Sequence, residues 1–264
     1  MVSCLGLGTV KLGRNQGVKY PAGFTLPDDD TVVALLSQAR ALGINLIDTA
    51  PAYGTSEERL GNLLTHRHKW IICSKVGEEF KDGNSFFDFS AGHVKRSVER
   101  SLRRLNTDYL DIVLVHSDGN DLKIINQTDC LEQLQRLKQA GSIRAFGMST
   151  KTVAGGLTAA ELSDVVMVTF NTQATEDAVV IDKASSLHKG VLIKKGLASG
   201  HLDALTQADQ DPVKASLAFI LRKSGVSSVI VGTINASHLA HNVDAAIAAT
   251  RQGQGRRSEN DGAL

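Results

Sequence analysis

Four polar side chains in this sequence have the chemistry to move a proton: the carboxylate of Asp48, the phenol of Tyr53, the ammonium of Lys75 and the imidazole of His116. A phenol is a poor acid at neutral pH, because its ordinary pKa is about 10. A neighbouring ammonium is expected to lower that pKa, and a carboxylate would hold the ammonium in place. The phenol would then protonate a carbonyl oxygen that a neutral imidazole orients. This set favours carbonyl–alcohol interconversion with hydride from a cofactor.

Short apolar runs alternate with amphipathic segments along the whole chain, and this order must position the four groups. Eight runs rich in β-branched residues predict strands at residues 2–8, 44–49, 70–76, 109–116, 143–149, 165–171, 191–194 and 229–231. Helical spacing of apolar residues predicts helices over residues 28–42, 90–105, 174–188, 212–224 and 237–250. Strands that alternate with helices pair in parallel through right-handed crossovers.

The alternation allows an open doubly wound sheet or a closed barrel. An open sheet that binds a dinucleotide has GxGxxG after its first strand, but here Lys11 stands where the third glycine belongs. Eight strands fit a closed barrel, so we predict an α/β fold: a single-domain (β/α)8 TIM barrel with shortened rim loops over residues 1–250. A barrel carries its chemistry where strands end, as Asp48, Lys75 and His116 do. Residues 251–264 lack periodicity and are predicted to be a flexible C-terminal tail.

Composition excludes several classes of partner. Lys and Arg total 29 and Asp and Glu total 28, so no net field attracts nucleic acid. The apolar runs are too short to span a membrane, and three separated cysteines without a CxxC pair favour a cytoplasmic protein. We expect no metal site, because His238 and His241 lack a third ligand. The expected partner is a small carbonyl substrate, and the expected assembly is a monomer or small homo-oligomer.

Several segments resemble one enzyme family, the aldo-keto reductases. The motif that carries the family's catalytic Asp and Tyr is similar to residues 48–54 (DTAPAYG), and the segment with its Lys is similar to residues 74–77 (SKVG). The long signature that ends at the active-site His resembles residues 97–116. A further likeness lies at residues 143–149, and the whole resemblance runs from about residue 5 to residue 249.

The resemblance implies a (β/α)8 barrel that reduces aldehydes or ketones to alcohols with NAD(P)H. It assigns Tyr53 as the general acid, Lys75 and Asp48 as the groups that tune it, and His116 as the group that orients the carbonyl. The alternative hypothesis is a barrel that binds cofactor weakly and acts as a sensor or as a regulatory or interaction subunit with little turnover.

The same resemblance implies a cofactor site, which departs from the family pattern. Its residues are Thr9, Asp48, Ser149, Thr150, Met167, Lys194, Leu197, Gly232, Thr233, His238 and Asn242. Met167 replaces a glutamine donor, and Lys194 replaces an aromatic that stacks on the nicotinamide. Gly232 and His238 stand where the family usually has Lys and Arg anchors. We expect NADP(H) in preference to NAD(H), with weakened affinity that Lys194 and Lys195 partly restore by pairing with the pyrophosphate.

Two predicted rim loops are candidates for the walls of a substrate site. The first covers residues 9–26 and contains Tyr20 and Phe24. The second covers residues 77–89 and is rich in phenylalanine, and we expect its aromatic side chains mainly to cover the core.

Overall fold

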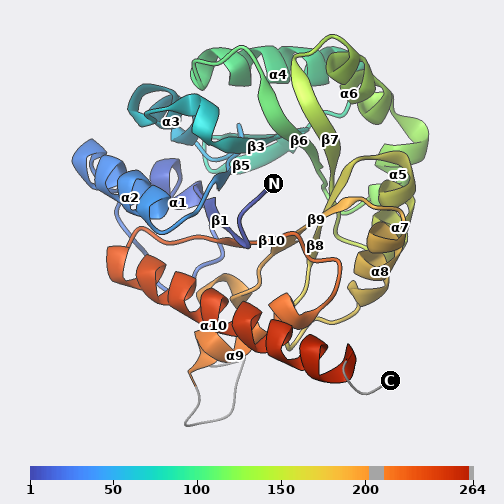
Figure 1. The fold of residues 1–264 in the computed structure, drawn as a ribbon. Coiled ribbons are helices and arrows are strands. Elements are labelled where there is room, and N and C mark those ends of the chain that lie inside the picture. The colour runs from blue at the N-terminus through green and yellow to red at the C-terminus, as the bar shows by residue number, and fades with distance from the viewer. Residues whose placement is uncertain (202–210, 262–264) are drawn as a thin grey trace.

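Eight parallel strands close into a barrel that helices surround (Figure 1). The computed structural model describes the backbone of residues 1–201 and 211–261. The barrel strands are β1 (Leu5–Gly8), β2 (Leu46–Asp48), β3 (Ile71–Val76), β6 (Leu110–His116), β7 (Ile143–Ser149), β8 (Val165–Thr169), β9 (Gly190–Lys194) and β10 (Ser228–Val231). Each of the eight predicted strands is therefore confirmed, and so is the single-domain TIM barrel.

The register of the strands brings the candidate residues to one level of the barrel. Asp48 at the end of β2 pairs with Cys73 of β3, two residues before Lys75. His116 at the end of β6 pairs with Ser149 at the end of β7. The last strand, β10, pairs with β1 and completes the ring. The polar groups thus meet at the carboxyl ends of the strands, which is where barrels build their sites.

The outer ring consists of helices between the strands, and side-chain caps define where several begin. They are α1 (Val10–Gly13), α2 (Asp29–Ala41), α3 (Ser56–Leu63), α4 (Ala91–Arg104), α5 (Asp121–Gln127), α6 (Cys130–Gln139), α7 (Val153–Leu162), α8 (Ala178–Ser186), α9 (Pro212–Arg222) and α10 (Ala236–Asp261), with short 3-10 turns at Arg67–Lys69 and Ala198–Gly200. Asp28 accepts a hydrogen bond from Thr31 N, and Ser90 accepts one from His93 N. Both are the N-cap contacts that polar residues make before a helix.

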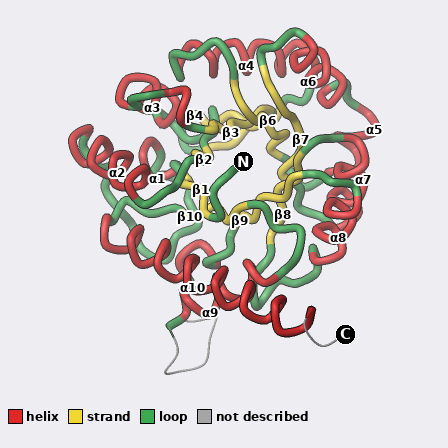
Figure 2. Tube along the Cα trace, viewed as in Figure 1, coloured by secondary structure: helices red, strands yellow, loops and turns green. Residues whose placement is uncertain are grey.

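Two apolar layers hold the site in place. The larger one lies between the strands and the outer helices. The smaller one fills the barrel interior and includes Cys73, Leu114 and Met167, so the candidate site lies on an apolar layer. Val2 packs against this inner layer, and the N-terminus lies over the middle of the ring of strands in Figure 2. Cys73 is fully buried, as expected for a small packing residue.

One predicted loop is a hairpin instead. Residues 77–89 contain β4 (Glu78–Lys81) and β5 (Asn84–Phe87), which pair antiparallel. Asp82 and Gly83 between them both have positive φ, the conformation of a two-residue type I′ turn. Phe86 is 57% exposed and Phe87 is 39% exposed. The expectation that the aromatics of this segment cover the core is therefore wrong for these two residues.

The last helix is longer than predicted. We expected helix only as far as residue 250, but α10 continues to Asp261 and so includes most of the segment predicted as a flexible tail. Residues 262–264 lie outside the described part, and the boundary at residue 250 stays a prediction. Among the helices of the described residues, α10 included, none combines the length and apolar character needed to cross a lipid bilayer.

Candidate active site

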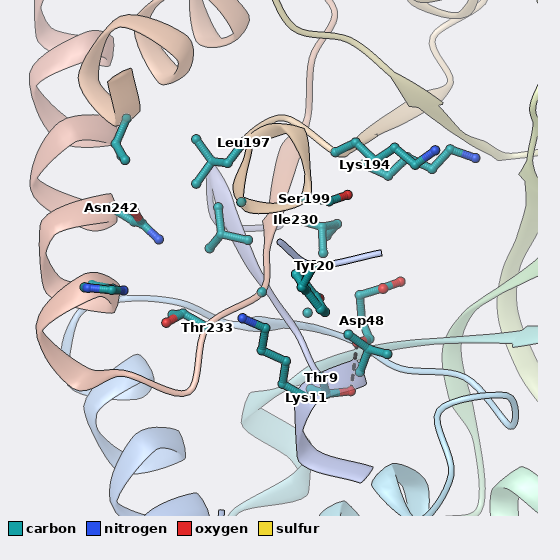
Figure 3. A pocket seen from close by; sticks show the side chains of 18 of the residues that line it. Thr9, Lys11, Tyr20, Asp48, Lys194, Leu197, Ser199, Ile230, Thr233 and Asn242 are labelled. Atoms are coloured by element: carbon teal, nitrogen blue, oxygen red, sulfur yellow. Dashed lines mark hydrogen bonds between the residues drawn. The ribbon is translucent and has the colours of Figure 1, made fainter. Parts of the chain in front are cut away.

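A cavity of about 940 Å³ opens at the carboxyl ends of the barrel strands (Figure 3). All four candidate catalytic residues line it. Of the predicted cofactor residues, every one except Thr150 lines it as well, and these are Thr9, Asp48, Ser149, Met167, Lys194, Leu197, Gly232, Thr233, His238 and Asn242. One site thus gathers side chains from both ends of the chain.

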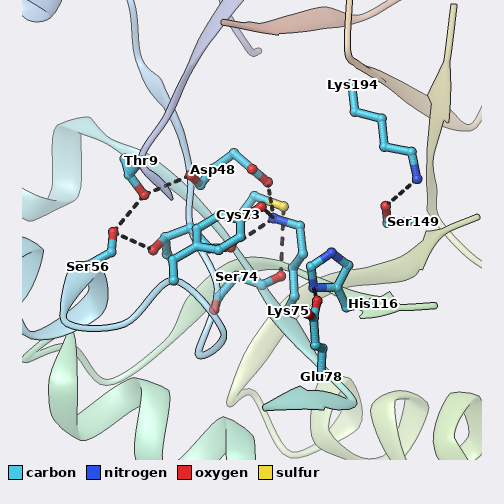
Figure 4. Close-up of polar contacts among 12 residues, drawn as sticks. Thr9, Asp48, Ser56, Cys73, Ser74, Lys75, Glu78, His116, Ser149 and Lys194 are labelled. Carbon is cyan, nitrogen blue, oxygen red and sulfur yellow. Dashed lines mark hydrogen bonds and ion pairs between the residues drawn. The ribbon is translucent and has the colours of Figure 1, made fainter. Parts of the chain in front are cut away.

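Lys75 is the centre of the catalytic corner (Figure 4). Its side chain is 2% exposed, and its Nζ donates to Asp48 Oδ1 at 2.6 Å, to the carbonyl oxygen of Thr49 at 2.9 Å and to Tyr53 Oη at 3.2 Å. An ammonium has three N–H donors, and each has an acceptor here. Because the phenol oxygen accepts from Lys75, its own proton remains available to a group in the cavity.

The acidity of Tyr53 differs from the sequence-based expectation. Burial raises the pKa of the phenol above its ordinary value, and Asp48 adds to that rise, while Lys75 opposes it. Lys75 does lower the pKa of Tyr53, as expected, but burial and Asp48 raise that pKa by more. For Lys75, burial alone would lower the pKa, but Asp48 and Tyr53 together raise it above its ordinary value. The corner therefore holds a neutral phenol beside a charged ammonium at neutral pH.

Hydroxyl groups fix the backbone that carries the corner. Thr9 Oγ1 donates to the carbonyl oxygen of Asp48 at 2.9 Å, and Ser56 Oγ donates to Thr9 Oγ1 at 2.8 Å. After β2 the chain turns at Gly54, whose φ is +61°. A Cβ atom at Gly54 would lie 2.1 Å from the carbonyl oxygen of Gly13. Only glycine fits this close approach, so the residue after Tyr53 is dictated by packing.

His116 has a charged partner that sequence reasoning missed. Its Nδ1 lies 2.7 Å from Oε2 of Glu78, the first residue of β4. Ser85 Oγ donates to Glu78 Oε1 at 2.6 Å, and Arg14 lies 3.8 Å from the same oxygen. Burial alone would raise the pKa of Glu78, but these contacts, led by His116, lower it to about 2. The Asp82-Gly83 turn signal would have indicated the hairpin, but nothing in the sequence pairs Glu78 with His116.

Lys194 lies across the cavity from Lys75 and makes contacts that the resemblance did not suggest. Its Nζ donates to Ser149 Oγ at 2.9 Å and to the carbonyl oxygen of Thr150 at 2.5 Å. Burial, together with the neighbouring Lys195, lowers the pKa of this ammonium to about 7. The ammonium thus contacts the serine that the resemblance assigns to the nicotinamide amide.

Thr233 and Asn242 lie at the far end of the cavity (Figure 3), and His238 also lines the cavity. Tyr20, from the loop between α1 and α2, also lines the cavity, as predicted for a wall of the site, and Lys11 Nζ lies 4.1 Å from the centre of its ring. His241 Nε2 lies 2.9 Å from Asp211 Oδ2, a contact that the sequence did not predict. Within the described residues, no cluster of three His, Cys, Asp or Glu side chains has the arrangement of a metal site.

A (β/α)8 barrel with these groups at its mouth has the architecture of a carbonyl-reducing oxidoreductase. The sequence profile of the Aldo/keto reductase family matches residues 4–183. The chain belongs to this family and is an enzyme of the oxidoreductase class. Enzymes of this family use nicotinamide cofactors.

Individual relatives cover nearly the whole chain. L-galactose dehydrogenase of Arabidopsis thaliana is 31% identical over 92% of this chain and 84% of its own length. The solved structure of a Pseudomonas aeruginosa protein, named as a putative aldo-keto reductase, is 53% identical, with a TM-score of 0.86, and covers 94% of this chain and 91% of that one. The holo form of AKR11C1 from Bacillus halodurans is 25% identical, with a TM-score of 0.77, and covers 92% and 86%.

Proposed function

We propose that the protein reduces aldehydes or ketones to alcohols, with Tyr53 as the general acid and with NADP(H) preferred over NAD(H). The observation that carries the proposal is the bonding of Lys75. Its three N–H groups are all taken by Asp48, Thr49 and Tyr53, so the phenol accepts from the ammonium. The phenol keeps its own proton to give, and it faces the cavity in which His116 also lies.

The proton transfer follows from these contacts. The raised pKa of Tyr53 keeps the phenol protonated at neutral pH. When the carbonyl oxygen gains negative charge, the phenol proton moves to that oxygen. The phenolate left behind still accepts the hydrogen bond from Lys75, so the charge formed on Tyr53 is stabilised by a fixed ammonium. Asp48 holds that ammonium at 2.6 Å throughout.

The residues on the other side of the cavity fit a nicotinamide cofactor. Ser149 accepts from Lys194, and its hydroxyl proton remains free to bind a carboxamide oxygen. The Asn242 amide lines the far end of the cavity and can serve the adenine side. Thr233, His238, Leu197 and Lys195 complete the lining that would hold the dinucleotide. When bound, the cofactor supplies a hydride to the carbonyl carbon.

The setting of this activity is also a proposal. We place the enzyme in the cytoplasm, as a monomer or small homo-oligomer acting on a small carbonyl substrate. Because one relative is an L-galactose dehydrogenase, aldoses belong in the set of compounds to be tested.

The test compares wild-type protein with Tyr53→Phe on a panel of aldehydes, ketones and aldoses. Turnover with NADPH should fall roughly 10²- to 10⁴-fold in the variant, since a general acid contributes about that much. Tyr109→Phe is the matched control, because Tyr109 contacts Arg67 and Arg144 outside the cavity. Full activity in Tyr53→Phe would refute the assignment. Cofactor binding by the wild type without any turnover would favour the sensor hypothesis instead.

A further inference from the structure

Among the described residues, Glu78 is the one carboxylate that contacts the imidazole of His116. The carboxylate lies on β4, in a hairpin that leaves the barrel directly after β3, and its Oε2 is 2.7 Å from Nδ1. No other polar atom of the described residues hydrogen-bonds this buried Nδ1. Ser85 from β5 donates to the second oxygen of Glu78, so the carboxylate is itself held in place. Figure 4 shows Glu78 beneath the ring, on the side away from Ser149 and Lys194.

This contact restricts where the imidazole carries its proton. A carboxylate oxygen and a bare ring nitrogen both present lone pairs, and they repel each other at 2.7 Å. A proton must therefore lie on Nδ1. A neutral imidazole has only one N–H, so its Nε2, which faces the cavity, is then an acceptor. A carbonyl oxygen is an acceptor too, and the neutral ring of His116 cannot donate to it.

We propose that Glu78 is a positioning residue that keeps the proton of neutral His116 on Nδ1, so that Nε2 binds a carbonyl oxygen only when the ring is positively charged. This inference rests on the proposed function and on the role that the family resemblance gives His116, which is to orient the reacting oxygen. Glu78 thereby ties carbonyl binding to the protonation of His116. The enzyme becomes a reductase whose efficiency declines as the ring loses its charge.

In the part of the chain that the structure describes, three charged or titratable groups other than Glu78 face His116. Burial lowers the pKa of the ring, Glu78 works against that lowering, and the ammonium groups of Lys75 on β3 and Lys194 on β9 add to it. Tyr53 meets the ring edge-on, with the ring centres 6.3 Å apart. Glu78 is the only carboxylate among these groups, so the stabilisation of the charged ring depends on it. Lys194 also loses its proton near pH 7, and the experiment must separate the two titrations.

The first measurement is the tautomer of His116 by NMR on protein labelled with ¹⁵N-histidine, without cofactor, with His116→Gln used to assign the signal. We expect neutral His116 in the wild type to carry its proton on Nδ1. In Glu78→Ala the buried Nδ1 loses its acceptor, and the proton should move to Nε2. Glu79→Gln is the matched control, because Glu79 lies on the same hairpin but pairs with Arg100 and His93. Its His116 signals should match the wild type.

The second measurement is kcat/KM for carbonyl reduction against pH. In the wild type, kcat/KM should fall about tenfold per pH unit above the pKa of His116. Glu78→Ala should flatten this fall, because its neutral ring can donate from Nε2. Glu78→Gln offers an amide oxygen to Nδ1 but no charge, so the fall should move to lower pH. In Glu79→Gln, kcat/KM should fall at the same pH as in the wild type.

Two results would overturn the proposal. One is a wild-type neutral ring with its proton on Nε2, or an unchanged tautomer in Glu78→Ala. The other is a falling limb that Glu78→Ala and Glu78→Gln leave unaltered, which would assign the titration to Lys194. Failure of the proposed function is a separate result: no carbonyl would be reduced by any protein, while the NMR spectra would still decide whether Glu78 holds the ring.

Discussion

At the ends of β2 and β3, each N–H of Lys75 meets an acceptor within 3.2 Å. At the end of β9, on the other side of the same cavity, Lys194 donates to a hydroxyl and to a carbonyl oxygen, but no carboxylate of the described residues lies within ion-pair distance of it. The proton-transfer half is thus complete before any ligand arrives, whereas the other half leaves donors and charge for a ligand to satisfy. Preorganised polar groups favour chemistry, and unsatisfied ones favour binding.

Lys75→Met should produce the largest effect, because it removes the centre of the complete half. Asp48 would be left buried with no cation beside it. Breaking a buried pair in this way costs about 3–5 kcal/mol of unfolding free energy. Turnover should also become undetectable as the phenolate loses its partner. Urea unfolding monitored by circular dichroism measures the first effect. A Lys75→Met variant as stable as the wild type would contradict the idea that the ion pair between Lys75 and Asp48 stabilises the proton-transfer half of the cavity.

Gly54→Ala tests the backbone of the same half. The new Cβ would meet the carbonyl oxygen of Gly13, and alanine is strained at a φ of +61°. We expect a loss of roughly 2 kcal/mol or more in unfolding free energy. Turnover should fall with it, since the preceding residue is Tyr53. Gly43→Ala is the control, because φ is also positive there but a Cβ would meet nothing within 4 Å. Equal losses in the two variants would show that strain alone, and not the close approach, matters at Gly54.

Lys194→Met tests the binding half. The pKa of about 7 means that Lys194 gives up its positive charge as the pH rises through neutrality. Wild-type affinity for NADH should therefore weaken from pH 6 to pH 8, by up to about tenfold, since a charge-assisted contact is lost. The variant should bind weakly with little dependence on pH. Fluorescence titration measures both, and NADH is used because it lacks a 2′-phosphate with its own titration. A steep pH dependence in Lys194→Met would place the effect elsewhere.

His238→Arg should give the smallest change and act in the opposite direction. A guanidinium can pair with a 2′-phosphate by two hydrogen bonds, which neutral histidine cannot do. NADPH affinity should rise roughly tenfold, while NADH affinity stays the same. Calorimetric titration with the two cofactors makes each the control for the other. An equal gain with both would mean that residue 238 does not lie near the 2′ position.

The sequence predicted the features of the site that depend on local patterns, but not those that depend on contacts between distant residues. The barrel followed from the alternation of apolar runs, and the corner from polar residues at strand ends, because both are local patterns. The pKa of Tyr53 was predicted in the wrong direction, since the depth of its burial depends on packing around the whole corner. The contact between Glu78 and His116 joins residues 38 positions apart, and only the folded hairpin brings them together.

The contacts of Lys194, in the cofactor-binding half of the cavity, also could not be predicted from the sequence. From its position in the chain we predicted that the Lys194 ammonium would pair with the cofactor pyrophosphate. In the structure this ammonium donates to Ser149 and Thr150 instead. A flexible side chain of four carbons can reach several acceptors, and its choice depends on neighbours from other strands. The sequence predicts the backbone position of such a residue in the barrel, but it does not predict which acceptors its ammonium group contacts.

The pairing of β1 with β10 has a consequence for synthesis of the chain. Asp48, Tyr53, Lys75 and His116 all leave the ribosome early, but the strand that seals the ring ends at Val231. Until that strand has emerged, the barrel of the nascent protein cannot close. Its catalytic residues then lie on an incomplete sheet whose apolar surface is exposed to water. We expect translation products truncated before β10 to be inactive and to depend on chaperones, although they contain every residue assigned to proton transfer.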